Sequence, residues 1–254
     1  MKLGYPNHPR RDLTQEIAWI GRNGFDFIDL FLEPDLGESR DVVPENIRDS
    51  MSEFGLDGVG HLAWYLPIGS PIRELREGAV AASKRYLALF AACGIKKVTI
   101  HAHWPPSMFS VEEGIEFQTK SLKALLEWCS ANAMTLMYEP VGDSREDRST
   151  LEHLFNLNPE LAFHLDIGHF NLNGRNPGDF AEAFRDRLVH VHLHDNDGNR
   201  DLHLPMGAGK IDWKAFLPRL KAVYDGTITI EVFSAEREYA LHTQRRLKEV
   251  WNTL

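Results

Sequence analysis

The segment VHVHLHDNDGNRDLH, residues 189–203, concentrates side chains that can bind a metal ion or move a proton. Its histidines His190, His192 and His194 alternate with Val and Leu, a period of two that is typical of a β-strand with one polar face. Asp201 and His203 follow as an Asp-x-His pair. Because carboxylate and imidazole are common ligands of Zn²⁺ and Mn²⁺, we expect His192 to supply a ligand from the strand and the pair to return from the following loop. The alternative for the pair is to cap the loop or the next helix.

Similar side chains stand at the ends of five other strand-like segments. They are His61, His101 with His103, Glu139, Asp166 with His169 in DIGH, and Glu231 in ITIEVF. Carboxylates gathered near one axis are costly to bury unless a cation neutralises them. We therefore predict that Glu139, Asp166, His192 and Glu231 bind a divalent metal ion, rather than forming structural hydrogen bonds alone. We expect His190, deeper in its strand, to be a hydrogen-bonded histidine of the interior.

The segments that carry these residues alternate with helical patterns, with a period of roughly 30 residues that matches a βα unit. The helical patterns include residues 76–93 and 114–130, and Gly24, Gly55 and Gly94 suit the left-handed position that ends a helix. The expected strands are residues 2–6, 25–32, 57–64, 96–103, 135–140, 161–170, 188–196 and 226–233.

Eight such units predict one α/β domain over residues 1–254, a single (β/α)₈ TIM barrel. The runner-up is a doubly wound open sheet, which normally carries a glycine-rich phosphate loop after its first strand. The corresponding stretch here, GYPNHPRR, is not such a loop. In a barrel the chemistry collects at the carboxyl ends of the strands, where the polar residues stand.

The composition narrows the classes of protein. At 254 residues and 43% hydrophobic, the chain can bury a substantial core, and its net charge of −9 disfavours nucleic acid as a partner. No apolar run is long enough to span a bilayer, so we expect no membrane partner. Cys93 and Cys129 stand in helical patterns without a CxxC motif, which favours a reducing, cytoplasmic setting. The sequence leaves open whether the chain forms a homo-oligomer.

Several residues near the predicted site have two interpretations each. His61 and His101 could bind a second metal ion or line a substrate pocket. His103 and His194 could contact substrate at the rim or lie in solvent. Trp64 follows a site-bearing strand, where it could stack on a sugar ring or base, or could simply pack.

The motifs YEP, DIGH, HVHLHDNDG…DLHLPMGAGKIDW and IEV, in this order, resemble the xylose-isomerase-like barrel superfamily. That superfamily contains sugar isomerases and epimerases, together with the endonuclease IV type of apurinic endonuclease. The resemblance to the epimerase branch implies one metal site built from Glu139, Asp166, His192 and Glu231. It also implies that Glu139 and Glu231 are the catalytic acid/base pair and that His169 contacts the substrate.

The resemblance to the endonuclease branch implies as many as three metal ions. His61 and His101 match the ligands of its first metal, with Glu139 as a bridge, and HLAWYLPIGSP resembles the segment after its strand-three histidine. His169, together with Asp201 and His203, matches the ligands of its third metal. However, the loop after Glu139 reads EPVGDSRED, which is acidic where a DNA-facing loop should not be.

Three hypotheses follow. The first is an isomerase or epimerase dependent on Mn²⁺ or Zn²⁺ that acts on a small sugar or related hydroxy-ketone, with proton transfer through an enediolate. The second is an endonuclease IV-like phosphodiesterase with several zinc ions. The third is a barrel that binds a metal or ligand without catalysis. The number of metal ions bound per chain distinguishes the first hypothesis from the second. Catalytic turnover distinguishes both of them from the third. The sequence does not identify the carbohydrate or show whether it is phosphorylated.

Overall fold

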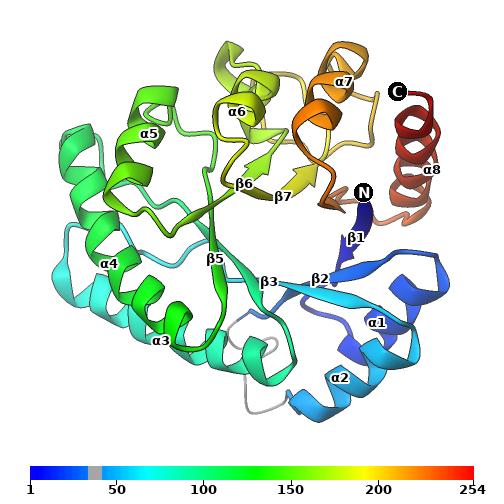
Figure 1. The fold of residues 1–254 in the computed structure, drawn as a ribbon, viewed down its shortest axis with the longest axis horizontal. Coiled ribbons are helices and arrows are strands. Elements are labelled where there is room, and N and C mark those ends of the chain that lie inside the picture. Colours follow the sequence, from blue (N-terminus) through cyan, green and yellow to red (C-terminus); the bar gives the residue numbers. More distant parts are fainter. Residues whose placement is uncertain (34–41) are drawn as a thin grey trace.

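The predicted strands form a closed barrel of parallel strands, each paired with its neighbours in sequence order (Figure 1). The structure is a computed structural model that describes residues 1–33 and 42–254. Strand β8 pairs with β1 and closes the barrel, which confirms the predicted (β/α)₈ architecture. The strands are β1 (Lys2–Pro6), β2 (Phe27–Phe31), β3 (Asp57–His61), β4 (Lys97–His101), β5 (Thr135–Glu139), β6 (Ala162–Asp166), β7 (Leu188–Leu193) and β8 (Thr227–Ile230).

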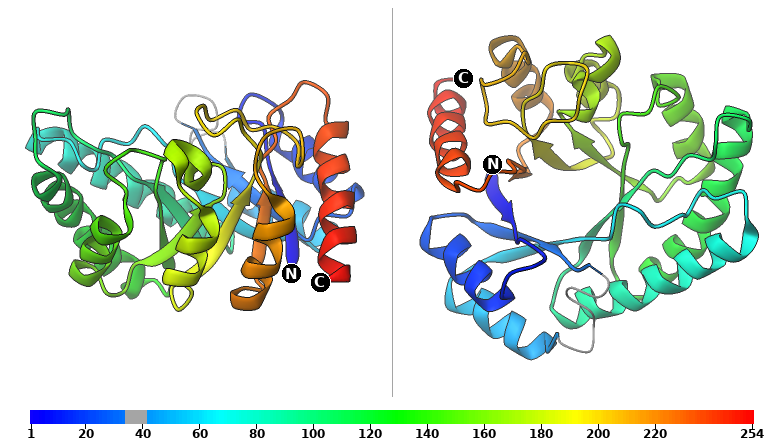
Figure 2. Two further views of the ribbon diagram at one scale, coloured as in Figure 1. Left: turned by 90° about the horizontal axis from the view of Figure 1, so that it is seen from above. Right: turned by 180° about the vertical axis from the view of Figure 1, so that it is seen from behind.

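Helices surround the barrel on its outside (Figure 2). The two predicted helical patterns correspond to α3 and α4, and both helices begin earlier than predicted. For α4 the cause is a capping box, in which Ser110 Oγ accepts from the Glu113 N–H and Glu113 Oε2 accepts from the Ser110 N–H. The helices are α1 (Leu13–Arg22), α2 (Pro44–Glu53), α3 (Arg73–Ala92), α4 (Val111–Ala131), α5 (Arg148–Leu157), the 3₁₀ helix η1 (His169–Gly174), α6 (Pro177–Ala183), α7 (Trp213–Val223) and α8 (Glu238–Thr253).

The hydrophobic core lies between the barrel and the helices. Ile228 and Ile230 of β8 are fully buried in this layer, and burial of one such side chain contributes about 1.5–3 kcal/mol. The three predicted helix-ending glycines Gly24, Gly55 and Gly94 all have positive φ, which confirms their left-handed role. Among the described residues, no helix has the length and apolar character needed to cross a membrane.

The inside of the barrel is polar beneath its carboxyl-end mouth. Thr229, between the two isoleucines of β8, points inward, and its hydroxyl donates to Asp29 Oδ2 at 2.9 Å. His190 contacts Thr227 Oγ1 at 2.8 Å, and His164 contacts Thr99 Oγ1 at 3.0 Å. A barrel interior is usually filled by branched apolar side chains, so this hydrogen-bonded layer is a specific support for the residues above it.

Candidate active site at the barrel mouth

Acidic and imidazole side chains from at least six strands meet at the mouth of the barrel. The strands place each of them at or near a carboxyl end, where parallel strands of a closed barrel converge. These residues are Asp29 on β2, His61 on β3, His101 on β4, Glu139 on β5, Asp166 on β6, His192 on β7 and Glu231 immediately after β8.

Glu139 lies at the centre of this group. Its Oε2 is 3.4 Å from His61 Nε2 and 3.2 Å from His101 Nε2. Its Oε1 is 3.5 Å from His192 Nδ1, and His164 Nδ1 is 3.3 Å from Oε2. All these side chains are buried, so the carboxylate of Glu139 faces several imidazoles with little water around it. One carboxylate with imidazoles beside each of its oxygens can serve two adjacent metal positions.

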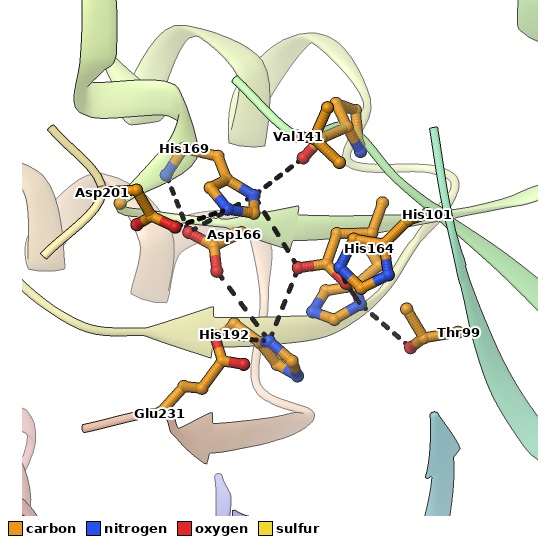
Figure 3. A network of polar contacts seen from close by, with 12 residues as sticks. Thr99, His101, Val141, His164, Asp166, His169, His192, Asp201 and Glu231 are labelled. Carbon is orange, nitrogen blue, oxygen red and sulfur yellow. Dashed lines mark hydrogen bonds and ion pairs between the residues drawn. The ribbon is translucent and has the colours of Figure 1, made fainter. Parts of the chain in front are cut away.

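His192 joins the carboxylates of three strands. Its Nδ1 is 3.1 Å from Glu231 Oε2 and 3.8 Å from Asp166 Oδ2, in addition to Glu139 (Figure 3). Its other nitrogen, Nε2, is 2.8 Å from Asp29 Oδ2. The four residues expected to bind one metal therefore meet around a single imidazole nitrogen.

A second group of donors comes from the end of β6, from η1 and from the loop after β7. His169 Nε2 is 3.4 Å from Asp201 Oδ2, and His203 Nε2 is 3.0 Å from the same oxygen. His194 Nε2 is 3.0 Å from Asp166 Oδ1 and 3.5 Å from Asp201 Oδ1. The Asp-x-His pair thus returns from its loop to the mouth.

The loop is held in this return by the buried Asp195. The Asp195 carboxylate accepts from the backbone N–H of Asn196, Gly207 and Ile211, and from Trp213 Nε1 at 2.8 Å. His203, within the loop, has a φ of +47°, a conformation that non-glycine residues rarely adopt. The backbone is therefore strained at His203, the residue whose imidazole this loop places in the site.

The donor set fits a divalent cation. His61 Nε2, Glu139 Oε2, Asp166 Oδ2 and His194 Nε2 are buried, and within residues 1–33 and 42–254 their charged neighbours lie outside hydrogen-bond geometry, which is costly unless another group satisfies them. Among the described residues, triples of donor atoms lie within 4.8 Å of one another in five combinations. Three of these are His61–His101–Glu139, Glu139–Asp166–His192 and His194–Asp201–His203. Carboxylate and imidazole together suit Zn²⁺ or Mn²⁺.

The carboxylates determine the pKa values of the imidazoles beside them. Burial disfavours protonation of His192, but Glu231 and Glu139 outweigh it and raise its pKa well above the usual range. His169 behaves likewise, because the charges of Asp166 and Asp201 overcome burial and raise its pKa. A metal ion binds only neutral imidazole, so metal binding here must release protons.

The pKa of His101 is shifted in the opposite direction from the pKa values of His192 and His169. Burial, aided by the nearby charges of His61 and His169, lowers its pKa well below the usual range. A neutral imidazole can bind a metal ion without first losing a proton. His101 is therefore ready to act as a ligand at neutral pH.

Two histidines differ from the placement expected from sequence. His194 was expected at or beyond the rim, but it is fully buried between Asp166 and Asp201. Its ring lies against Gly168, where an added Cβ would be 1.9 Å from His194 Cε1. His103 is half-buried, and its backbone N–H donates to Gln118 Oε1 at 3.1 Å. Neither histidine lines the cavity above the site.

Two polar residues of the site were missed by the sequence reasoning. Asp29 lies in the apolar strand FIDLF, and His164 lies two residues before Asp166. An aspartate at an inward position of an apolar strand needs a charged partner inside the barrel, and that signal could have identified it. Hydrogen bonds from His190 and His192 overcome the effect of burial and lower the pKa of Asp29.

A cavity of about 340 Å³ opens above these residues. It lies at the small end of the range of about 300–1,000 Å³ that is typical of small-molecule sites. Both glutamates and Trp64 line it, so the predicted catalytic residues and a predicted stacking residue share one space. The full lining is Phe31, Glu33, His61, Trp64, His101, Glu139, Val141, His169, Asp201, His203, Glu231 and Phe233.

Curated proteins with related sequences include the following two. An uncharacterised protein of Methanocaldococcus jannaschii is 32% identical over 146 residues, which cover 53% of this chain and 50% of that protein. The matched region thus spans half the length of that relative. A 3-dehydro-D-guloside 4-epimerase of Escherichia coli K12 is 24% identical and covers 91% of this chain and 94% of that protein.

Solved structures share the fold over the whole chain. A D-tagatose 3-epimerase-like protein superposes with a TM-score of 0.86 at 24% identity and covers 100% of this chain and 99% of the other. The IOLI protein with a binding zinc atom gives a TM-score of 0.84 at 18% identity, with the same coverage. The family described as xylose isomerase-like TIM barrel matches residues 17–250. This match covers most of the barrel and both glutamates, and the chain therefore belongs to the xylose isomerase-like TIM barrel family.

Proposed function

We propose that the chain is a divalent-metal-dependent isomerase or epimerase that acts on a small sugar or related hydroxy-ketone. The observation that carries this proposal is the position of two glutamates around one imidazole nitrogen. Glu139 Oε1 and Glu231 Oε2 are 3.5 and 3.1 Å from His192 Nδ1, and both residues line the same cavity. They come from β5 and from the end of β8, so a substrate between them would meet a carboxylate from each side.

Glu139, Asp166, His192 and Glu231 would hold the metal ion. When bound, a divalent cation supplies electrostatic stabilisation of negative charge that develops on the oxygens of a hydroxy-ketone. Its identity as Mn²⁺ or Zn²⁺ is part of the proposal, and the zinc atom in the IOLI structure supports the latter.

Proton transfer would be carried out by the two glutamates. Burial opposes ionisation of Glu231, but His192 and His203 overcome it and lower its pKa. Glu231 is thus ionised at neutral pH and can accept the proton from the carbon beside the carbonyl, which gives an enediolate. Glu139 would return a proton to the other face of that carbon, or to its neighbour. His169, on the cavity wall beside Asp201, would hydrogen bond to the substrate.

The relatives support a carbohydrate substrate. The Escherichia coli relative is named a 3-dehydro-D-guloside 4-epimerase, and further structures of the same fold are titled L-ribulose 3-epimerase and D-psicose 3-epimerase. The small cavity, with polar side chains among aromatic ones, suits a ligand of that size.

The test is formation of the isomerised or epimerised product in heavy water, followed by deuterium at its α-carbon, measured with metal-loaded Glu139→Gln and Glu231→Gln. General acid–base catalysis contributes about 10²–10⁴-fold, so we expect a loss of that size in each variant. Glu127→Gln, an exposed glutamate on α4, is the matched control and should retain full activity. Unchanged product formation in Glu139→Gln or Glu231→Gln that still holds its metal would refute the proposed role.

A second candidate is a phosphodiesterase with two or three metal ions. The donor triples His61–His101–Glu139 and His194–Asp201–His203 favour it, because they provide positions beside the main one. About one tightly bound ion per chain would support the epimerase, and two or three with cleavage of an abasic-site duplex would support this candidate.

The loop after Glu139 presents less negative charge than its sequence implies, so it argues less strongly against a DNA substrate. Glu146 is fully buried and accepts from Trp104 Nε1 at 2.9 Å and from the Asp143 N–H at 2.9 Å. Asp143 forms an ion pair with Arg145 at 2.7 Å. Two of the acidic groups in EPVGDSRED are therefore neutralised or hidden within the loop.

A further inference from the structure

A second cavity adjoins the one above the candidate site. It measures about 660 Å³, roughly twice the volume of the site cavity. The two cavities share four lining residues, namely Phe31, Glu33, Trp64 and Phe233, so they meet along a common border. A ligand that fills the site cavity can therefore extend into the adjoining one without crossing a wall of protein.

Two exposed aromatic side chains stand at this border. Trp64, after β3, is 66% exposed, and Phe233, after β8, is 56% exposed, so both rings have surface open to a ligand. Phe233 is held by stacking on His203, with ring centroids 4.2 Å apart and planes 20° apart. Aromatic faces exposed beside a site suit the apolar C–H faces of a sugar ring.

The adjoining cavity offers hydrogen-bonding groups but none of the donor triples found among the described residues. Arg237 forms an ion pair with the buried Glu16, and Arg11 Nη1 is 3.9 Å from the same carboxylate. Ser234 also lines the wall. This cavity thus offers guanidinium and hydroxyl groups that can hydrogen bond to a sugar, while Glu139 and Glu231 line the site cavity and not the adjoining one.

We infer that the substrate is a two-ring carbohydrate, in which the reacting hydroxy-ketone unit is joined by a glycosidic bond to a second sugar ring. The reacting unit occupies the site cavity beside Glu139 and Glu231. The second ring lies in the adjoining cavity and stacks on Trp64 or Phe233 at the border. A free monosaccharide would leave the larger cavity filled with water alone. This inference rests on the proposed function, because it assigns the part of that substrate which does not react.

The test compares D-fructose with lactulose, in which a galactose ring is attached to the same ketose. Their binding to zinc-loaded protein is measured by calorimetry, with Trp64→Ala and Ala235→Trp as variants. Trp64→Ala removes a stacking face, and Ala235→Trp fills the adjoining cavity from its exposed wall. Leu75→Ala, an exposed apolar residue that lines neither cavity, is the control.

We expect lactulose to bind at least about tenfold more tightly than fructose, because only lactulose has a second ring that can stack on an exposed aromatic face and occupy the adjoining cavity. Each variant should lower the affinity for lactulose about tenfold more than that for fructose, and Leu75→Ala should change neither. Equal affinity for the two sugars would refute the inference that the substrate has a second ring, and so would equal losses of affinity for both sugars in the variants. Either result would leave the proposed function intact. Failure of both sugars to bind would count against the carbohydrate substrate itself, and hence against both proposals.

Discussion

The Asp29 carboxylate lies 2.8 Å from His192 Nε2 and joins β2 to β7 through the inside of the barrel. This contact leaves His192 Nδ1 directed at the carboxylates of Glu139, Asp166 and Glu231. A carboxylate behind a metal-binding histidine fixes the orientation of the ring and makes the imidazole a stronger ligand. Thr229 donates to the same Asp29 oxygen, so the carboxylate is itself held in place.

Asp29→Asn is expected to lower the affinity for the metal ion about 10–100-fold, because outer partners of metal ligands typically contribute that much. The asparagine keeps the shape of the side chain, so the barrel should still fold. The affinity is measured by competition with a chelator, and Asp49→Asn, an exposed aspartate on α2, is the control. Equal metal affinity in wild type and Asp29→Asn would show that the contact does not orient a ligand.

Gly168→Ala is expected to destabilise the protein by about 1–3 kcal/mol through overpacking. The backbone of Gly168 is helical, with φ −66° and ψ −45°, so alanine fits the backbone but its Cβ would collide with the ring of His194. Displacement of that ring would also loosen Asp166 and Asp201 and reduce the bound metal. Urea denaturation and metal analysis measure the two effects.

The matched control for this substitution is Gly78→Ala. Gly78 lies inside α3 with no atom near its missing Cβ, and alanine there should stabilise the helix by up to about 1 kcal/mol. A stable Gly168→Ala protein with full metal content would mean that the packing of His194 is unimportant for the site.

The stability of the metal-free protein should fall as the pH rises from about 6.5 to 9. Burial opposes protonation of His203, but the charges of Glu231 and Asp201 outweigh it and raise its pKa from the usual 6.5 to about 9. A raised pKa in the folded state stabilises the fold below the unfolded pKa, and this contribution disappears as pH passes the folded pKa. His192 and His169, whose pKa values are also raised, act in the same direction.

Metal affinity should rise over the same pH interval, because the cation must displace these protons. Urea denaturation of metal-free protein at several pH values measures the first effect, and calorimetric metal titration measures the second. His203→Gln should flatten the stability profile. A metal-free stability that increases between pH 6.5 and 9 would contradict the assigned charges of the imidazoles.

The sequence predicted the barrel because the alternation of inward and outward side chains is local. In β7, for example, His190 and His192 face inward and Val191 faces the helices, as the period of two requires. The same logic brought Glu139 and Glu231 to one mouth. The sequence could not show which inward residues meet across the barrel, because that depends on the stagger of the strands. The contact of Asp29 with His192 is of this kind.

The contacts between loops could not be predicted from the sequence either. The burial of Glu146 depends on Trp104, which is 42 residues away, and the burial of His194 depends on the missing side chain of Gly168. Both follow from how the loops after the strands fold over one another. A prediction from composition alone therefore overestimates the exposed negative charge of the EPVGDSRED loop.

The central claim is that the carboxylates and imidazoles around Glu139 hold a divalent cation. Its most direct test is elemental analysis of purified protein after incubation with Zn²⁺ or Mn²⁺ and removal of free ions, in wild type and in a double variant His192→Ala and Asp166→Asn. We predict at least one tightly bound ion per wild-type chain and loss of that ion in the double variant. A wild-type chain without bound metal, or a double variant with the full amount, would contradict the account.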